Sequence, residues 1–127
     1  MDDATVVLDD ATLVRDLKAT VEAFCSARNW DQFHSPKDLA IGIITEASEL
    51  LEHFRFQSAE RCEAMLQDER KRREVGEELA DVLFFILRFS GKYKMDLSEA
   101  FAAKMAKNEA RYPADKFWGQ NRKYDEV

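Results

Sequence analysis

Apolar residues recur at helical spacing along most of the chain. Between residues 13 and 28 they return every three or four positions, a pattern that predicts an amphipathic helix. A second helix is expected from Pro36 to about Arg55, because Ser35 is a good N-cap and proline favours the first helical position. Apolar positions spread around more than one face of this second segment, which indicates burial on more than one side.

Two further long helices are expected in the second half of the chain. The periodic run over residues 75–86 predicts the third helix, with Gly91 as its terminator. Asp96 and Glu99 have the spacing of a capping box, which predicts the start of a fourth helix. That helix should stop before Pro113.

The composition agrees with this pattern. Only 4 glycines and 2 prolines occur in 127 residues, so residues that break helices are rare. We predict an all-α, four-helix-type bundle in one domain spanning residues 1–127, with residues 1–10 and 114–127 as flexible or partner-contacting tails. The breadth of the apolar faces predicts assembly as a homo-oligomer, either a dimer or a tetramer.

The charge balance narrows the range of partners. Lys and Arg number 19 against 25 Asp and Glu, a formal net charge of −6, which argues against binding long nucleic acid by counterion release. Charged residues make up 35% of the chain and interrupt the apolar runs, so no membrane span is expected. The acidic N-terminus lacks the features of a secretory signal, and we expect a cytoplasmic protein in which Cys25 and Cys62 stay reduced.

Two pairs of carboxylates occupy the most apolar parts of the predicted helices. Glu46 and Glu49 are three residues apart in the second helix, and Glu78 and Asp81 are three apart in the third. Residues at this spacing share a helix face, so each pair directs its oxygens to one side. Clustered carboxylates in apolar surroundings repel one another unless a cation neutralises them. The four side chains are therefore candidate ligands of a metal ion.

Ligation by oxygen alone favours a hard divalent cation, Mg²⁺ or Mn²⁺. The residue three before His53 is Leu50, so the Glu-x-x-His signature of di-iron bundles is absent. The alternative is that the acids pair with Lys and Arg, either on solvated faces or between protomers of a structural oligomerisation protein. Stabilisation by Mg²⁺ would separate these two hypotheses.

Cationic, amide and aromatic side chains accompany the carboxylates. On the fourth helix, Lys104, Asn108 and Arg111 share a face and offer donors to phosphate oxygens; the alternative is an exposed basic stripe. Four aromatic or imidazole side chains are candidates for stacking on a planar ring or for hydrogen bonding to its edge. Core packing would equally explain the two phenylalanines among them. Those candidates are Trp30, His34, Phe56 and Phe85.

The ordered set of motifs resembles one known family. Glu46-x-x-Glu49 followed by Glu78-x-x-Asp81 is similar to the metal-binding signature of the MazG-like, all-α nucleoside triphosphate pyrophosphatases, close to the dCTP pyrophosphatase branch. The resemblance extends to Trp30-Asp31-Gln32-Phe33-His34, Lys104, Asn108, Arg111-Tyr112-Pro113 and Arg122-Lys123-Tyr124. It implies an oligomer of helical protomers that uses Mg²⁺, with the four acids as metal ligands and Tyr112 among the residues that bind substrate.

The expected reaction is attack of water on the α-phosphorus of a nucleoside triphosphate, dCTP or a related pyrimidine deoxynucleotide. The products would be the nucleoside monophosphate and pyrophosphate. A bound cation would acidify the water, and Glu49 or Glu46 would accept its proton. The alternative function is a non-catalytic helical module that binds nucleotide and metal without releasing pyrophosphate.

Overall fold

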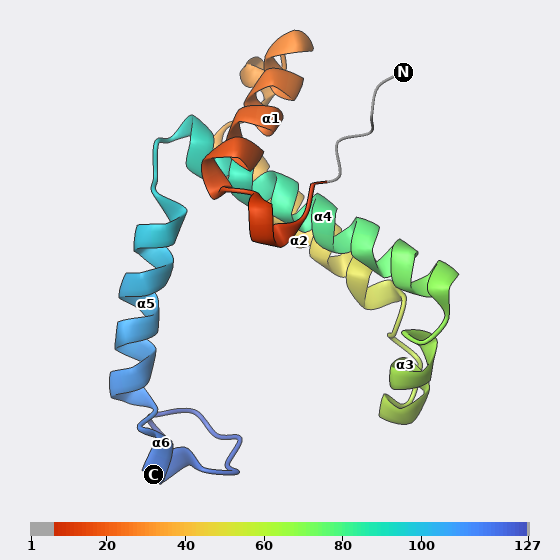
Figure 1. The fold of residues 1–127 in the computed structure, drawn as a ribbon, viewed down its shortest axis with the longest axis vertical. Helices are drawn as coiled ribbons and strands as arrows, with labels where there is room; N and C mark the ends of the chain where they lie inside the picture. The colour runs from red at the N-terminus through yellow and green to blue at the C-terminus, as the bar shows by residue number, and fades with distance from the viewer. Residues whose placement is uncertain (1–6, 127) are drawn as a thin grey trace. The chain divides into compact units, whose positions relative to one another are not determined.

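The computed structural model describes residues 7–126, which form helices and connecting turns without a strand (Figure 1). The all-α prediction is therefore confirmed. The first six residues of the predicted tail 1–10 lie outside the described residues. In chain order the helices are the 3₁₀ helix η1 (Asp9–Ala11), α1 (Val14–Ala27), the 3₁₀ helix η2 (Asp31–Phe33), α2 (Pro36–Glu52), α3 (Ala59–Met65), α4 (Glu69–Lys92), α5 (Leu97–Arg111) and α6 (Ala114–Phe117).

The chain divides into two compact units, Met1–Lys94 and Met95–Val127. The first contains helices α1 to α4, and the second contains α5, α6 and the C-terminal segment. Across the described residues, every helix is too short or too polar to cross a membrane.

Local capping sets the starts of the long helices. The Ser35 hydroxyl accepts a hydrogen bond from the Asp38 backbone N–H at 3.2 Å, and the Asp38 carboxylate accepts one from the Ser35 N–H at 3.1 Å. This reciprocal pair, with proline at the first helical position, begins α2 at the predicted residue. Asp68 and Asp96 cap α4 and α5 by accepting from the backbone N–H three residues further on.

The end of α4 differs from the prediction. The helix continues past Gly91 to Lys92, and the left-handed conformation that follows it falls on Lys94, whose φ is 56°. The side chains of Lys92 and Tyr93 donate hydrogen bonds to the backbone carbonyl of His34. Tertiary contacts therefore hold a last turn that the local sequence does not predict.

The end of α2 also comes earlier than predicted, at Glu52 instead of near Arg55. Beyond it the Phe54 N–H donates to the Leu51 carbonyl at 2.9 Å, three residues back. This is the spacing of a 3₁₀ helix, which often closes the last turn of an α-helix. The turn that follows carries Phe56 to the surface.

Helices α2 and α4 lie side by side in the first unit (Figure 1). Three contacts show that they run antiparallel: His53 with Glu78, Gly42 with Phe85, and His34 with Arg88. A Cβ atom on Gly42 would lie 2.5 Å from a ring carbon of Phe85. Glycine at this position therefore permits the close approach of the two helices.

The core of the first unit is small and lies where α1 and α2 pack on or near α4. Cys25 and Leu39 are fully buried, and Val21, Val75 and Leu87 are nearly so. Because so few apolar side chains are covered, most of the remaining apolar surface of these helices stays exposed in the single chain.

The second unit consists of α5 and the segment that follows it. The Tyr112 ring packs edge-on against Phe117 at 4.9 Å and against Tyr124 at 5.9 Å between ring centroids. The Tyr112 hydroxyl accepts a hydrogen bond from the Tyr124 backbone N–H at 3.3 Å. The segment predicted as a C-terminal tail therefore folds back on the end of α5 within this unit.

Candidate functional site

Carboxylates from α2 and α4 converge in the first unit. Glu46 and Glu49 come from α2 and Glu78 from α4, and one carboxylate oxygen of each lies within 4.8 Å of the others. Asp81, one turn further along α4, is not part of this set of three. Its negative charge nevertheless contributes to raising the pKa of Glu46. The structure thus brings three of the four predicted metal ligands together and places Asp81 at the edge of the cluster.

Glu46 is surrounded by the negative charges of Glu49, Asp81 and Glu78. Its Oε2 atom is buried and has no hydrogen-bond partner in the part of the chain that the structure describes. A hydrogen bond with Glu49, burial and the surrounding negative charges raise the pKa of Glu46 to about 7. A buried, unpaired carboxylate oxygen among like charges is strongly favoured to bind a cation.

The donor set fits a hard divalent cation. The converging atoms are carboxylate oxygens, the ligands that Mg²⁺ and Mn²⁺ prefer. The unpaired Oε2 of Glu46 supplies a ligand atom that no protein group already occupies. These residues could therefore hold a divalent cation between α2 and α4.

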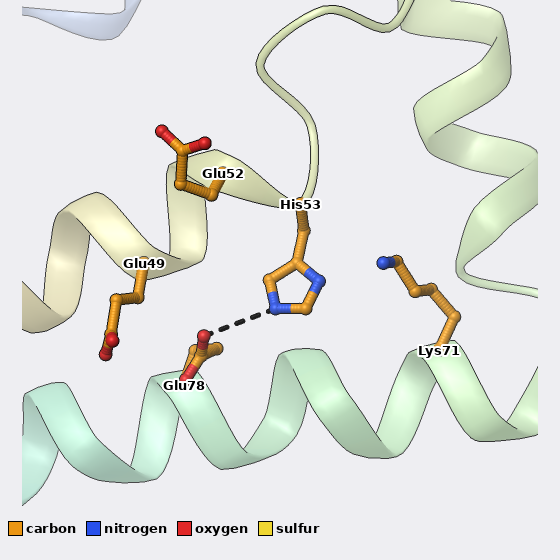
Figure 2. Close-up of a pocket in the computed structure, with 5 residues that line it drawn as sticks. All are labelled: Glu49, Glu52, His53, Lys71 and Glu78. Atoms are coloured by element: carbon orange, nitrogen blue, oxygen red, sulfur yellow. Dashed lines mark hydrogen bonds and ion pairs between the residues drawn. The ribbon is translucent and has the colours of Figure 1, made fainter.

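An open pocket of about 400 Å³ adjoins the carboxylates. It is lined by Glu49, Glu52, His53, Lys71 and Glu78 (Figure 2). His53 points from the end of α2 to Glu78, with its Nε2 atom 3.3 Å from Oε2 of the carboxylate. Lys71 extends from α4 toward the same space. The pocket therefore combines carboxylates with an imidazole and an ammonium group beside the candidate metal ligands.

The loop between α1 and α2 carries Trp30 and His34 side by side. Their ring centroids are 6.2 Å apart, with the rings inclined at 71°. Trp30 is 37% exposed and also packs edge-on against Phe24 at 5.4 Å, whereas His34 is buried. The structure thus brings together the two loop residues predicted to contact a base.

Arg88 on α4 is buried against this loop. Its Nε donates to Nδ1 of His34 at 2.8 Å, its Nη1 to Glu22 at 2.8 Å and its Nη2 to Asp31 at 3.1 Å. The Lys92 ammonium donates to the backbone carbonyls of Asp31 and His34. Burial, together with the positive charges of Arg88 and Lys92, lowers the pKa of His34 below its usual value. The imidazole is therefore neutral at pH 7.

Several residues of these clusters were not predicted from the sequence: Glu52, His53 and Lys71 in the pocket, and Glu22, Arg88 and Lys92 around His34. His53 stands four residues after Glu49, and Lys71 stands seven before Glu78. Both separations are helical repeats that keep a common face, so the periodicity could have identified them. Arg88 interrupts the most apolar stretch of α4, and a charged residue in such a position needs buried partners.

The two candidate phenylalanines have different surroundings. Phe85 is half-buried against Gly42 and packs edge-on against Phe84 at 5.2 Å between ring centroids. Phe56 is 84% exposed in the turn after α2, with the Arg55 guanidinium 4.8 Å from its ring centroid. Phe85 is thus part of the packing between α2 and α4, whereas Phe56 presents its ring to solvent.

The candidate phosphate contacts lie in the second unit. Lys104 is exposed on α5, and the half-buried Asn108 donates from its amide to Sδ of Met105 at 3.7 Å. The Arg111 guanidinium lies 4.7 Å from the ring centroid of Tyr124. Lys104, Asn108 and Arg111 share one face of α5, as their spacing predicts. Tyr112 follows at the C-terminal end of this helix.

Known proteins share this sequence pattern and fold. Residues 41–127 match the model of the MazG-like family. The dCTP pyrophosphatase 1 of Homo sapiens is 32% identical over 114 residues, covering 90% of this chain and 67% of that protein. The dCTP pyrophosphatase 1 of Bos taurus is 30% identical over the same length, covering 68% of that protein. A pyrophosphatase structure from Archaeoglobus fulgidus DSM 4304 matches with a TM-score of 0.74 and 35% identity, covering 85% of this chain and 99% of that one.

Proposed function

This chain belongs to the MazG-like family, and on that premise we propose that it is a nucleotide pyrophosphohydrolase. Its substrate is dCTP or a related pyrimidine deoxynucleoside triphosphate, and its products are the nucleoside monophosphate and pyrophosphate. The relatives named dCTP pyrophosphatase 1 support this substrate class. The observation that carries the proposal is the unpaired Oε2 of Glu46, buried where carboxylates of α2 and α4 converge.

The residues that hold the cation are Glu46, Glu49, Glu78 and Asp81, and the cation is Mg²⁺, or Mn²⁺ in its place. When bound, it neutralises charge on the phosphate oxygens and makes water more acidic. The contact of His53 with Glu78 fixes the orientation of that carboxylate, as groups hydrogen-bonded to metal ligands commonly do.

Glu49, or its partner Glu46, takes the proton of the attacking water. As the water oxygen bonds to the α-phosphorus, the bond from that phosphorus to the bridging oxygen breaks and pyrophosphate leaves. The proximity of the two glutamates supports this role, because with carboxylate oxygens within 4.8 Å of each other one can ligate the cation while the other accepts a proton.

The remaining substrate contacts divide into two sets. The base is enclosed by aromatic and imidazole groups, because stacking and hydrogen bonding to an edge together recognise a nucleobase. The phosphates are held by cationic, amide and hydroxyl donors. The base set is Trp30, His34, Phe56 and Phe85, and the phosphate set is Lys104, Asn108, Arg111 and Tyr112.

The working form is a homo-oligomer, a dimer or a tetramer, and its interface includes the uncovered apolar faces of α2 and α4. Ile44 is 70% exposed, Leu51 56% and Leu79 54% in the single chain. Large apolar side chains exposed together on neighbouring helices support an interface. A second copy of the chain is the proposed occupant of this surface.

The whole chain works as one MazG-like domain. The family match begins at residue 41 and ends at residue 127, so it includes parts of both compact units. The proposed compartment is the cytoplasm, where thiols such as the free Cys25 and Cys62 stay reduced.

Pyrophosphate release tests the proposal directly. The purified chain is assayed with each common deoxynucleoside triphosphate in Mg²⁺, Mn²⁺ or EDTA. We expect dCTP to be cleaved fastest and EDTA to abolish turnover. Glu49→Gln should be inactive, whereas Glu77→Gln, which alters an exposed neighbouring carboxylate outside the cluster, should keep activity. Binding of a nucleotide without pyrophosphate release would contradict the hydrolase proposal and favour the non-catalytic module.

A further inference from the structure

Arg88 and the carboxylates paired with it, Glu22 and Asp31, have no role in the substrate contacts described above. We propose that Arg88 is a positioning residue for nucleotide recognition: it holds His34 as the Nε2–H tautomer, so that the imidazole donates a hydrogen bond to an acceptor atom of the nucleobase. The inference rests on the proposed function, because it assigns the base end of the same site.

The tautomer follows from the chemistry of the two partners. A guanidinium carries donors and no acceptor. Because Nε of Arg88 lies 2.8 Å from Nδ1 of His34, Nδ1 must present a lone pair and the ring proton must be on Nε2. The other two arms of the guanidinium bind Glu22 and Asp31. Arg88 cannot rotate away from the imidazole without breaking both of these ion pairs.

The charges around the ring keep it neutral. Arg88 and Lys92 face it from α4, and both disfavour an imidazolium. Asp31 in η2 and Asp38 in α2 favour the charged form, but burial and the two cations outweigh them. A lowered pKa favours the neutral imidazole of His34 at neutral pH.

The donor atom is left for another molecule. Within the described residues, Nε2 of His34 forms no hydrogen bond, and the one buried side-chain oxygen or nitrogen without a partner is Oε2 of Glu46. Nε2 therefore keeps access to solvent although the residue is buried. The ring centroid of the partly exposed Trp30 lies 6.2 Å from that of His34. An aromatic face next to an edge donor is the combination that recognises a base.

The position of Arg88 along α4 relates the loop to the carboxylates. Glu78, Asp81 and Arg88 repeat at helical spacing on α4. From Asp81 to Arg88 the helix rises about 10 Å, at about 1.5 Å per residue, which is on the scale of a nucleotide.

Nuclear magnetic resonance of the ¹⁵N-labelled full chain identifies the tautomer of His34, and the measurement does not depend on enzymatic activity. In the wild type, Nδ1 of His34 should resonate as an unprotonated nitrogen and Nε2 as a protonated one. Arg88→Leu should give a mixture of tautomers. Arg88→Gln, whose amide can still donate to Nδ1, should keep more of the Nε2–H form. Arg28→Gln, which removes an exposed cation stacked on Phe24, is the matched charge control and should leave His34 unchanged.

Titration with Mg²⁺ and α,β-imido-dCTP, a non-hydrolysable probe, reads base recognition. The His34 Hε2 signal should move downfield and exchange more slowly with water when the probe binds. Arg88→Leu should weaken binding of the probe about three- to tenfold, as expected for losing one hydrogen bond. Arg88→Gln should bind the probe more tightly than Arg88→Leu does. Amide spectra of both variants should report the native fold.

A proton on Nδ1 in the wild type would overturn the inference, as would an Hε2 signal that the probe leaves unchanged. Wild-type affinity in both folded Arg88 variants would do the same. If the probe binds with the expected His34 signature but no triphosphate is cleaved, the proposed hydrolysis fails while the role of Arg88 stands. If the probe does not bind at all, the role of Arg88 fails as well.

Discussion

Replacing Gly42 with alanine should force α2 and α4 apart. The new Cβ would lie 2.5 Å from Cε1 of Phe85 and 2.8 Å from its Cζ, well inside the optimal separation of non-bonded carbons. The ring also packs edge-on against Phe84 at 5.2 Å, so moving it away from Gly42 disturbs a second contact. Gly42 lies one turn from Glu46 on α2, and Phe85 lies one turn from Asp81 on α4. The strain between Gly42 and Phe85 is therefore close to the carboxylates.

The magnitude follows from two opposing effects. Overpacking costs about 1–3 kcal/mol, whereas alanine in place of glycine inside a helix gains about 0.8–1 kcal/mol. Gly76 in α4 is the matched control, because nothing lies within 4 Å of a Cβ built there. Gly76→Ala should raise the free energy of unfolding by about 1 kcal/mol. Gly42→Ala should be neutral or lower it by up to about 2 kcal/mol.

Urea unfolding followed by circular dichroism measures both variants at the same protein concentration, which keeps any linkage to assembly equal. Phe85→Leu in the Gly42→Ala background should recover part of the loss, because the obstructing ring is gone. The kcat for dCTP should fall in Gly42→Ala and be retained in Gly76→Ala. If Gly42→Ala is as stabilising as Gly76→Ala, the close approach of the two helices is refuted.

Three further predictions concern the site. Glu78→Gln should abolish pyrophosphate release, because it removes one of three converging carboxylates. Its far-ultraviolet circular dichroism should match that of the wild type. Wild-type turnover of this variant at limiting Mg²⁺ would rule out Glu78 as a metal ligand. In the metal-free protein the pKa of Glu46 is raised from 4.5 to about 7, so its contribution to stability is full below pH 4.5 and is lost as the pH rises toward 7. The urea midpoint of the wild type, measured in EDTA, should therefore fall as the pH rises from 4.5 to 7. An equal fall in Glu46→Gln would contradict the assignment of this pKa to Glu46. Trp30→Ala should raise KM and flatten the preference among bases, whereas Lys104→Ala should lower kcat/KM by a similar factor for every triphosphate. Values of kcat/KM for dCTP, dTTP and dATP decide this point, and an unchanged preference in Trp30→Ala would limit that ring to packing.

The sequence by itself determines the helices and the pairing of acids along each one. Ser35 and Asp38 begin α2 through hydrogen bonds that span three residues, and Asp96 caps α5 in the same way. Such bonds form between neighbours in the chain, so their pattern is visible as spacing. The same holds for Glu46 and Glu49, whose common face follows from the helical repeat alone.

The tertiary structure decides which faces meet. Arg88 binds His34 across 54 residues, and His53 contacts Glu78 across 25. In each pair the partners lie on different elements with turns between them, so the periodicity of one helix does not predict these contacts. They exist because α2 and α4 pack antiparallel, with Gly42 admitting the ring of Phe85. Packing between helices depends on the shapes of both surfaces at once, and for this reason the partners of His34 and Glu78 emerge only from the folded chain.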